Sequence, residues 1–368
     1  MKTKLILPLL CASAACAFSQ QSAPPVRLAI YGLVHDHVGG MLPNLAGRAD
    51  IQLVGVVEPN KKLAALYAEK FHLDPKLFFT SLDDLRATTK VDAVATFTST
   101  FDHRRVVEMC APLGIDVMME KPFALNMDDA RAMAAAAAKG GIQVVVNYET
   151  TWYASNKSAY DLVHGANGIG EIRKIVVRDG HKGPALIGCS PYFLEWLTDP
   201  VLNGGGAIMD FGCYGADLVT WLMDGKRPTS VFAVTQNLQP ELYPKVDDDA
   251  TIVVNYPKAQ AIIEPSWDWP YGRKDMEIYG QTGALRLPDG KSVFLRMGDG
   301  GETAVPAPAL ASPNSDSLSY LVAVVRGEIK PSGLSSIETN LVATEILDAA
   351  RESARTGMRV YLAADPGK

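Results

Sequence analysis

Lys121, Asp210 and Tyr214 carry the functional groups that oxidation of an alcohol requires. Removing a hydride from a carbinol carbon needs a base for the hydroxyl proton and a positive group that stabilises the developing alkoxide. Lys121 supplies the positive charge. Asp210 and Tyr214 are four residues apart, so a helix at this point would place both side chains on one face. A tyrosine has an ordinary pKa of about 10, so Tyr214 needs a cation such as Lys121 to act near neutral pH.

The elements that position these residues follow two patterns. From Val26 to Asn147, apolar β-rich runs alternate with amphipathic or Ala-rich stretches, which is typical of βαβ units around a parallel sheet. After Asn147, strands follow one another with few helices, which predicts a mostly antiparallel sheet. The predicted strands are Val26–Gly32, Ile51–Glu58, Val91–Thr98, Asp116–Met119 and Gln143–Val146, then Ile172–Arg178, Val231–Gln236, Thr251–Tyr256, Ala259–Pro265 and Asp275–Tyr279. The predicted helices are Lys61–Phe71, Asp128–Lys139 (with Asn126 as its N-cap), Ala207–Met223 and Ser336–Thr356.

The chain is predicted to fold into an α/β Rossmann domain and a second, α+β domain. Its 368 residues, 48% of them hydrophobic, exceed what one core usually supports. We expect a dinucleotide-binding domain at 24–147, a substrate and oligomerisation domain at 148–335, and a C-terminal helix and tail at 336–362 that packs back on the first domain. The formal charge of −6 leaves no basic footprint for a polyanion, so nucleic acid is not expected as a partner.

The first residues have the pattern of a secretory leader. Lys2 and Lys4 precede an apolar run from Leu5 to Phe18, and small residues at Ala15 and Ala17, or at Ala17 and Ser19, offer cleavage sites, so residues 1–19 are predicted to be a signal peptide. An uncleaved anchor and a lipid-modified Cys16 are the alternatives. Cleavage would remove two lysines and no acidic residue, which takes the formal charge from −6 to −8. We expect a periplasmic or secreted protein with no membrane span after the leader, and its three remaining cysteines make no disulfide framework.

The first strand runs into a turn where a dinucleotide fold would bind phosphate. The expected pattern is G-x-G-x-x-G, and only Gly32 is in register, because Val34 and His37 occupy the other two glycine positions. Asp36 would also place a negative charge near a helix N-terminus that should attract phosphate. Glu58, at the end of the second strand, can accept hydrogen bonds from the adenosine ribose and would repel a 2′-phosphate, which favours NAD over NADP.

His35 and His37 suggest a metal pair at first sight. Two histidines and one aspartate within three residues, however, alternate in direction on a strand or spread around a helix. The sequence therefore predicts no metal site, and His35 and His37 are expected to line or shape the cofactor turn.

Glu120-Lys121-Pro122 follows a predicted strand and resembles the E-K-P motif of the Gfo/Idh/MocA oxidoreductase family. The segment Gly204-Gly205-Gly206-Ala207, followed by Asp210-x-Gly212-x-Tyr214-x-x-Asp217, resembles that family's G-G-G…D-x-G-x-[HY]-x-x-D pattern. Each of these residues taken singly has a structural explanation: Lys121 as a surface lysine, Asp210 as an aspartate at a helix start, and Tyr214 as a core tyrosine. Further segments with this resemblance are Val91–Val94 followed by His103, Ser266-Trp267, and Tyr279–Gly283.

The resemblance implies roles for particular residues. The residue at the Tyr214 position acts as acid/base in the family, and the lysine and aspartate, here Lys121 and Asp210, bind sugar hydroxyls. Tyrosine is found there in branches that resemble the exported glucose–fructose oxidoreductase and dihydrodiol dehydrogenase. The residues it places at the cofactor are Gly32, Val34, His35, His37, Glu58, Thr98, His103, Glu120 and Lys121. The candidate substrate contacts are Asn147, Tyr148, His181 and Trp267, although the arginine of the family's N-x-R sequence is missing after Asn147.

The function predicted from these residues is an NAD-dependent oxidoreductase that acts on a carbohydrate or related polyol. An exported enzyme has no free nicotinamide pool, so the cofactor is expected to be tightly bound and restored within each cycle. One alternative is a redox-neutral glycosidase or lyase that works by transient oxidation and elimination. The other is a non-catalytic sugar-binding protein, because the phosphate turn has lost two glycines. A homo-oligomer is expected by similarity to the family.

Overall fold

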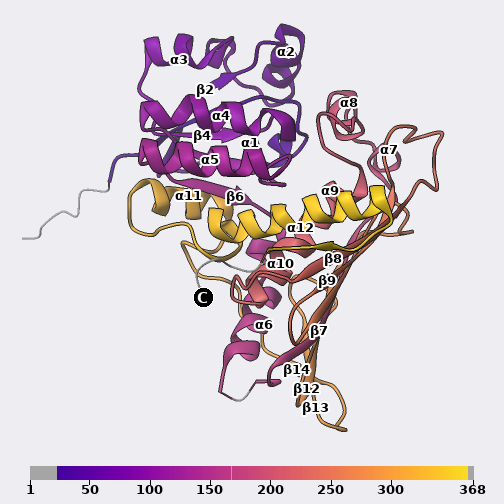
Figure 1. Ribbon diagram of the computed structural model, residues 1–368. Coiled ribbons are helices and arrows are strands. Elements are labelled where there is room, and N and C mark those ends of the chain that lie inside the picture. Colours follow the sequence, from indigo (N-terminus) through magenta and orange to yellow (C-terminus); the bar gives the residue numbers. More distant parts are fainter. Residues whose placement is uncertain (1–22, 167, 364–368) are drawn as a thin grey trace, which may run out of the picture.

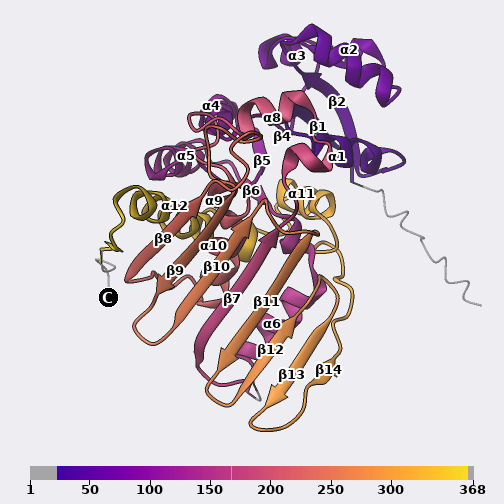
Figure 2. The same ribbon diagram turned by 90° about the vertical axis from the view of Figure 1, so that its right-hand side faces the viewer.

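The structure is a computed structural model, and it describes residues 23–166 and 168–363. It contains two sheets with helices packed between and around them (Figures 1 and 2). The predicted leader, residues 1–19, lies outside the described residues. Among the residues that are described, no helix has the length and apolar character to cross a membrane.

The first sheet has six parallel strands in the order β3-β2-β1-β4-β5-β6. The winding direction reverses between β1 and β4, and in such sheets ligands bind beyond the carboxyl ends of the strands at this point. The predicted parallel Rossmann sheet is therefore confirmed. Its strands are β1 (Val26–Tyr31), β2 (Ile51–Val57), β3 (Phe78–Phe79), β4 (Ala93–Thr96), β5 (Asp116–Glu120) and β6 (Val144–Asn147).

Helices cover both faces of this sheet because its strands are apolar on both sides. Leu28 and Ile30 of β1 face one layer of helices, and Ala29 between them faces the other. α11 comes from the range 148–335 that the sequence assigned to the second domain, yet it packs on the first sheet. The first layer is α1 (Val38–Leu45), α2 (Lys61–Lys70) and α11 (Ser317–Val325), and the second is α3 (Leu82–Thr88), α4 (His103–Cys110) and α5 (Met127–Gly140).

The second sheet has nine strands in the order β14-β13-β12-β11-β7-β10-β9-β8-β15. All neighbours are antiparallel except β7 and β10, so the predicted mostly antiparallel sheet is confirmed. Figure 2 shows one broad face without a covering helix. The strands are β7 (Ile172–Gly180), β8 (Ser230–Gln236), β9 (Asp249–Asn255), β10 (Gln260–Ser266), β11 (Arg273–Gly280), β12 (Gly283–Leu287), β13 (Val293–Met297), β14 (Thr303–Val305) and β15 (Val360–Tyr361).

The other face of the second sheet is covered by helices that include the predicted segment Ala207–Met223. This segment is not one helix: it breaks at Phe211, so Asp210 ends α9 and Tyr214 lies in α10. The covering helices are α6 (Ala154–His164), α9 (Ala207–Asp210), α10 (Gly212–Leu222) and α12 (Ile337–Thr356). Short 3₁₀ segments lie at Pro75–Leu77, Thr100–Asp102, Ala111–Leu113, Glu149–Trp152 and Gly333–Ser335.

α12 ties the two sheets together by polar contacts. The Asp348 carboxylate accepts a hydrogen bond from the Met127 N–H at the start of α5 (2.7 Å), and Arg351 donates to the Leu125 carbonyl (2.8 Å). The Tyr148 hydroxyl, just beyond β6, donates to Asn340 on the same helix (3.0 Å). The C-terminal helix therefore packs on α5 of the first domain and on α10 and β8 of the second.

We predict that Asp348→Ala lowers the stability of the junction between the two sheets. The change removes the acceptor of the Met127 N–H and the partner of Arg351, which should cost about 1–3 kcal/mol. Urea unfolding measures the loss, and Asp128→Ala serves as a control because that carboxylate is 94% exposed on α5. Equal midpoints for the two variants would show that the contact contributes nothing.

Candidate active site

A buried ion pair joins the end of β5 to α9. The Lys121 ammonium donates to a carboxylate oxygen of Asp210 and to the Asp210 carbonyl (2.9 Å). The second carboxylate oxygen accepts from the Trp267 indole N–H (2.9 Å), and both ionic side chains are only 5–6% exposed. Because each oxygen of Asp210 has a donor, the carboxylate and the ammonium are fixed in direction.

The protonation states of this pair follow from its contacts. Burial alone raises the pKa of Asp210, but the Lys121 ammonium outweighs it and holds that pKa below its ordinary value. Burial likewise favours neutral Lys121, but the Asp210 carboxylate outweighs it and raises the pKa of the ammonium. The pair is therefore ionised at neutral pH, and Lys121 is a permanent cation.

Tyr214 lies beside this pair, against two cations. The Lys121 Nζ is 5.2 Å from the centre of its ring, and the Lys274 Nζ is 3.6 Å from it. Burial, followed by the nearby Asp179 carboxyl, raises the pKa of Tyr214 well above its ordinary value. The expectation that Lys121 activates Tyr214 as a base is thus wrong for the resting site, because Asp210 already neutralises that ammonium. Tyr214 keeps its proton and is suited to donate it.

Lys274 and Asp179 belong to the site and were missed in the sequence. The Lys274 Nζ lies 3.1 Å from an Asp179 oxygen and 3.7 Å from one of Glu149. Burial raises the pKa of Asp179 to about 7, although Lys274 opposes the shift. A carboxyl tuned to this range is typical of functional sites. Lys274 is the second residue of strand β11, and nothing in its spacing distinguishes it.

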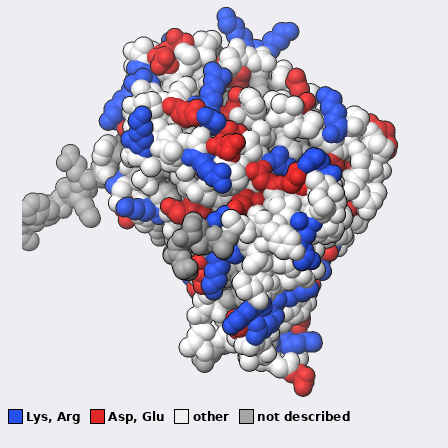
Figure 3. Space-filling view, in the orientation of Figure 1, with Lys and Arg blue, Asp and Glu red and all other residues white. Residues whose placement is uncertain are grey.

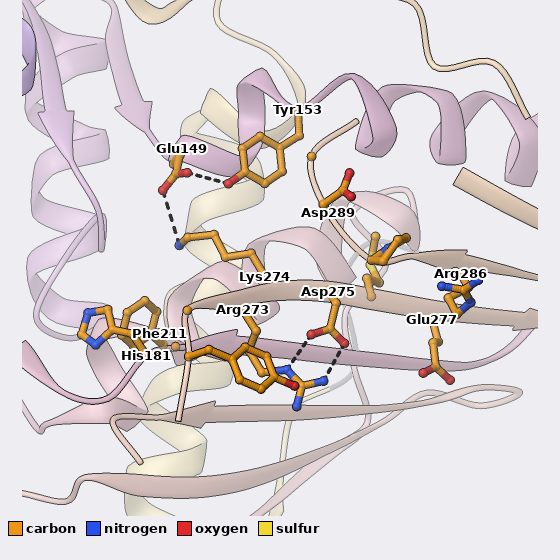
Figure 4. Close-up of a pocket in the computed structure, with 16 residues that line it drawn as sticks. Glu149, Tyr153, His181, Phe211, Arg273, Lys274, Asp275, Glu277, Arg286 and Asp289 are labelled. Carbon is orange, nitrogen blue, oxygen red and sulfur yellow. Dashed lines mark hydrogen bonds and ion pairs between the residues drawn. The ribbon is translucent and has the colours of Figure 1, made fainter. Parts of the chain in front are cut away.

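A cavity of about 580 Å³ opens on this side of the site (Figure 4). The figure shows Lys274 directed toward Glu149, with His181 and Phe211 at one end of the cavity. The His181 Nδ1 accepts from the Gly183 N–H (3.0 Å), so Nε2 carries the proton in the neutral ring. His181 is therefore a cavity-lining donor, in agreement with its place among the candidate substrate contacts.

A second cavity of about 690 Å³ lies on the other side of Glu149, which lines both. Asn147 lies here, and its side-chain amide donates to Glu120 (2.9 Å). The two other candidate substrate residues have different positions. Tyr148 is 1% exposed with its hydroxyl bound to Asn340, and Trp267 is fully buried against Asp210. In this structure both position neighbouring groups and neither is open to a ligand.

The turn after β1 is closed by bonds within the chain. Gly32 has φ +80°, and a Cβ there would come within 2.7 Å of the Thr98 side chain, so a glycine is needed. The Leu33 N–H donates to Glu58 (2.9 Å), and the His35 N–H donates to the Phe97 carbonyl (3.1 Å). The N–H groups of the following residues are also bonded within the turn: His37 to the His35 ring, Val38 to the carbonyl of His35, Gly39 to that of Asp36, and Gly40 to that of His37.

A segment of the second domain lies on this turn. α7 (Pro184–Ile187) and α8 (Pro191–Leu197) follow β7, and Figure 2 shows α8 beside β1 and α1. Both the N–H and the hydroxyl of Ser190, the N-cap of α8, donate to Asp36 (2.7 and 2.6 Å). The Trp196 indole donates to the Val34 carbonyl (3.2 Å), and its ring lies 5.5 Å from that of His35.

Three other predicted cofactor residues, Glu58, His103 and Thr98, also form hydrogen bonds within the chain. Both Glu58 oxygens accept backbone N–H groups, from Leu33 and Asn60 (2.9 and 2.8 Å). His103 is buried and bonded to the Phe123 carbonyl (3.2 Å), and Thr98 bonds Thr96 (3.1 Å). A dinucleotide needs free N–H groups at this turn for its pyrophosphate. The closed turn, covered by α8 and carrying Asp36, does not fit that group as it stands.

Two family models match the chain. Residues 31–148 match the model described as "Oxidoreductase family, NAD-binding Rossmann fold", and residues 159–286 match "GFO/IDH/MocA C-terminal domain". The chain belongs to the Gfo/Idh/MocA oxidoreductase family. The Lys121–Asp210 contact thus joins the two domains that these family models describe. The Rossmann fold is present, although Val34 and His37 replace two glycines of its phosphate-binding turn.

Relatives of this Gfo/Idh/MocA chain include dehydrogenases of small diols and polyols. It is 26% identical to trans-1,2-dihydrobenzene-1,2-diol dehydrogenase of Xenopus laevis over 82% of this chain and 90% of that protein. It is 24% identical to inositol 2-dehydrogenase of Rhizobium meliloti (strain 1021) over 87% and 94% of the two chains. The aldose-aldose oxidoreductase from Caulobacter crescentus, solved with glycerol, superposes with a TM-score of 0.77 at 24% identity, covering 92% and 100%.

We predict that Asp36→Ala increases the affinity for NAD at least about tenfold. The change frees Ser190 and therefore α8 from the turn, and it removes a negative charge from the phosphate position. Isothermal titration of the purified chain with NAD measures the effect. Glu69→Ala, an exposed acid on α2, controls for the change in net charge. Unchanged affinity in Asp36→Ala would show that α8 does not close the turn.

We also predict that Asp179 makes the stability of the protein depend on pH. Its pKa of about 7 in the folded chain exceeds the ordinary 3.8, so its contribution to stability is present below pH 4 and is lost as the pH rises through 7. Relative to Asp179→Asn, the wild type should lose about 2–3 kcal/mol between pH 5 and pH 8. Urea unfolding at both values measures this, and parallel profiles would contradict it.

Proposed function

We propose that this chain is an NAD-dependent oxidoreductase that interconverts a hydroxyl and a carbonyl group of a carbohydrate or related polyol. The observation that carries the proposal is the buried Lys121–Asp210 pair beside the ring of Tyr214, a tyrosine that keeps its proton. A permanent cation and a proton donor at one place are what an oxygen changing between carbonyl and alkoxide requires. Two cavities adjoin this place and give room for a small polar ligand.

Each residue then has a definite role. Lys121 holds the reacting oxygen and stabilises negative charge on it, while Asp210 and Trp267 keep the ammonium in position. Tyr214 gives its proton to that oxygen when a carbonyl is reduced. Oxidation needs the proton to leave, and Asp179, with a pKa of about 7 beside Lys274, is the nearby group tuned to accept one. His181 and Lys274 offer donors to the other hydroxyls of the substrate.

The redox partner in this proposal is NAD, which rests on the Rossmann family model and on Glu58 at the end of β2. A carboxylate at that position disfavours a 2′-phosphate. The closed turn sets a condition: α8 has to leave Asp36 and Val34 before a dinucleotide can bind in the family's manner. The substrate class rests on the relatives' names, which are diol, inositol and aldose enzymes.

A second candidate is a sugar-binding protein without redox activity, and the closed phosphate turn is the observation that favours it. The redox-neutral glycosidase uses the same residues for a transient oxidation, after which the aglycone is eliminated, water adds and the hydride returns. The predicted export is part of the proposal, because an enzyme outside the cytoplasm has no free nicotinamide pool and must keep its cofactor bound.

On the face shown in Figure 3, basic and acidic side chains are interspersed, which agrees with a small-molecule substrate rather than a polyanion.

Self-association is also proposed, through the helix-free face of the second sheet. Arg178, Glu264 and Glu277 carry ion pairs on adjacent strands of that face (2.8 and 3.1 Å). Light scattering of the purified protein should give a dimer or tetramer, and a monomer at all concentrations would contradict this.

Three assays distinguish the candidates. Denaturation of the purified protein should release NAD that mass spectrometry detects, or NAD added to the folded protein should bind. If no NAD is released and none binds, the sugar-binding protein without redox activity is favoured. Aldoses and cyclic polyols should then reduce NAD. Incubation with nitrophenyl glycosides, without an added acceptor, distinguishes the oxidoreductase from the redox-neutral glycosidase. Release of nitrophenol identifies the glycosidase.

We predict that Tyr214→Phe lowers kcat by about 10²–10⁴-fold with NAD affinity unchanged, because it removes only the proton donor. Steady-state rates and NAD titration measure the two quantities. Tyr271→Phe is the matched control, since that hydroxyl belongs to a residue 61% exposed at the rim of the cavity. Wild-type turnover in Tyr214→Phe would remove Tyr214 from the chemistry.

A further inference from the structure

The closed turn brings together three potential metal ligands from two distant segments. One ring nitrogen each from His35 and His37 and a carboxylate oxygen of Glu120 lie within 4.8 Å of one another. The turn between His35 and α1 is irregular, and it brings the two histidine rings together. Their ring centres are 4.4 Å apart, and the His37 Nδ1 lies 2.8 Å from Glu120 at the end of β5.

His35 has a free ring nitrogen in a place where such an atom is costly. The residue is 1% exposed, its Nδ1 lies 3.3 Å from the His37 backbone nitrogen, and its Nε2 has no hydrogen-bond partner within the described residues. Metal binding through Nε2 places the ring proton on Nδ1, and this gives up the long contact with the His37 N–H. An imidazole binds a metal through an unprotonated ring nitrogen, so the unpartnered Nε2 is the ligand atom that His35 offers.

The surroundings orient the three side chains as outer contacts do in metal sites. The Trp152 indole donates to Asn147 (3.0 Å), and Asn147 donates to the Glu120 oxygen that His37 does not use (2.9 Å). Phe193 and Trp196 of α8 flank the His35 ring at 4.7 and 5.5 Å. Such outer-shell bonds and apolar walls fix ligand orientation and strengthen metal binding.

The nearby charges leave room for a cation. Lys121 is the adjacent positive group, and Asp210 neutralises it. Glu120 is 3% exposed, and within residues 23–166 and 168–363 its carboxylate is hydrogen-bonded by the side chains of His37 and Asn147. His37 is 48% exposed at its side chain and, with Glu120, lines the cavity of about 690 Å³, so a bound ion would keep positions open toward that cavity.

We propose that His35, His37 and Glu120 form a binding site for a divalent transition metal of the zinc class, with open coordination positions facing the second cavity. Two imidazoles and one carboxylate with free positions are the donor set of catalytic zinc and related sites. The oxygen ligands that could complete it are water or vicinal hydroxyls of a polyol. This goes beyond the proposed hydride chemistry and does not depend on it.

The test is calorimetric titration of the chelator-treated full chain with ZnCl₂ in the absence of NAD and substrate. We expect one ion per chain with a micromolar or lower Kd. His37→Gln, at the exposed ligand, should weaken binding at least about 100-fold, and Asn147→Ala, which only orients Glu120, should weaken it about 10- to 100-fold. His164→Gln is the matched control on the surface and should bind as the wild type does.

Visible absorption of added Co²⁺ gives an independent readout, because bands from histidine-bound cobalt should appear in the wild type and in His164→Gln but not in His37→Gln. Circular dichroism checks that each variant folds. No Zn²⁺ binding by the folded wild type, or equal affinity in wild type and His37→Gln, would overturn the proposal. Either result would leave the proposed oxidoreductase function standing, since NAD reduction is measured separately.

Discussion

The buried contact between Lys121 and Asp210 is the interaction on which the site depends. It joins the carboxyl end of β5 in the first sheet to α9 in the second domain, and its two side chains are only 5–6% exposed. Loss of one partner from such a pair typically costs 3–5 kcal/mol because the other charge stays buried and unpaired. The Trp267 indole, the Tyr214 ring and the break between α9 and α10 all take their positions around it.

The two halves of the site differ in how closely they keep the family pattern. On the substrate side, a fixed cation, a protonated tyrosine and a carboxyl with a pKa of about 7 lie next to a cavity that His181, Phe211 and Lys274 line. On the cofactor side, the N–H groups of Leu33, His35 and His37 are bonded within the chain, and α8 covers the turn. The closed conformation therefore couples any dinucleotide binding to movement of α8, and it assembles His35 and His37 against Glu120.

Much of this architecture could be predicted from the sequence, for physical reasons. The parallel strands are buried on both faces and are read as short apolar runs, and Asn126 caps α5 as expected by accepting the Asp129 N–H (2.9 Å). The E-K-P and G-G-G…D-x-G-x-Y segments located Lys121, Asp210 and Tyr214. The signs of the pKa shifts could not be predicted, because they depend on burial and on Asp210 being paired with Lys121.

What the sequence missed depends on contacts between distant segments. Ser190 and Trp196 meet the turn 154 and 162 residues away from their partners, and His37 meets Glu120 across 83 residues. No local periodicity encodes such contacts. The placement of α11 on the first sheet is of the same kind, since its apolar face is compatible with either domain.

The central claim is that a substrate hydroxyl binds between Lys121 and Tyr214, and a crystal structure of the full chain with a cyclic polyol such as inositol tests it most directly. The account predicts a hydroxyl oxygen about 2.7–3.2 Å from both the Lys121 Nζ and the Tyr214 Oη. A polyol bound without contact to either residue, while the Lys121–Asp210 pair stays as it is here, would contradict it.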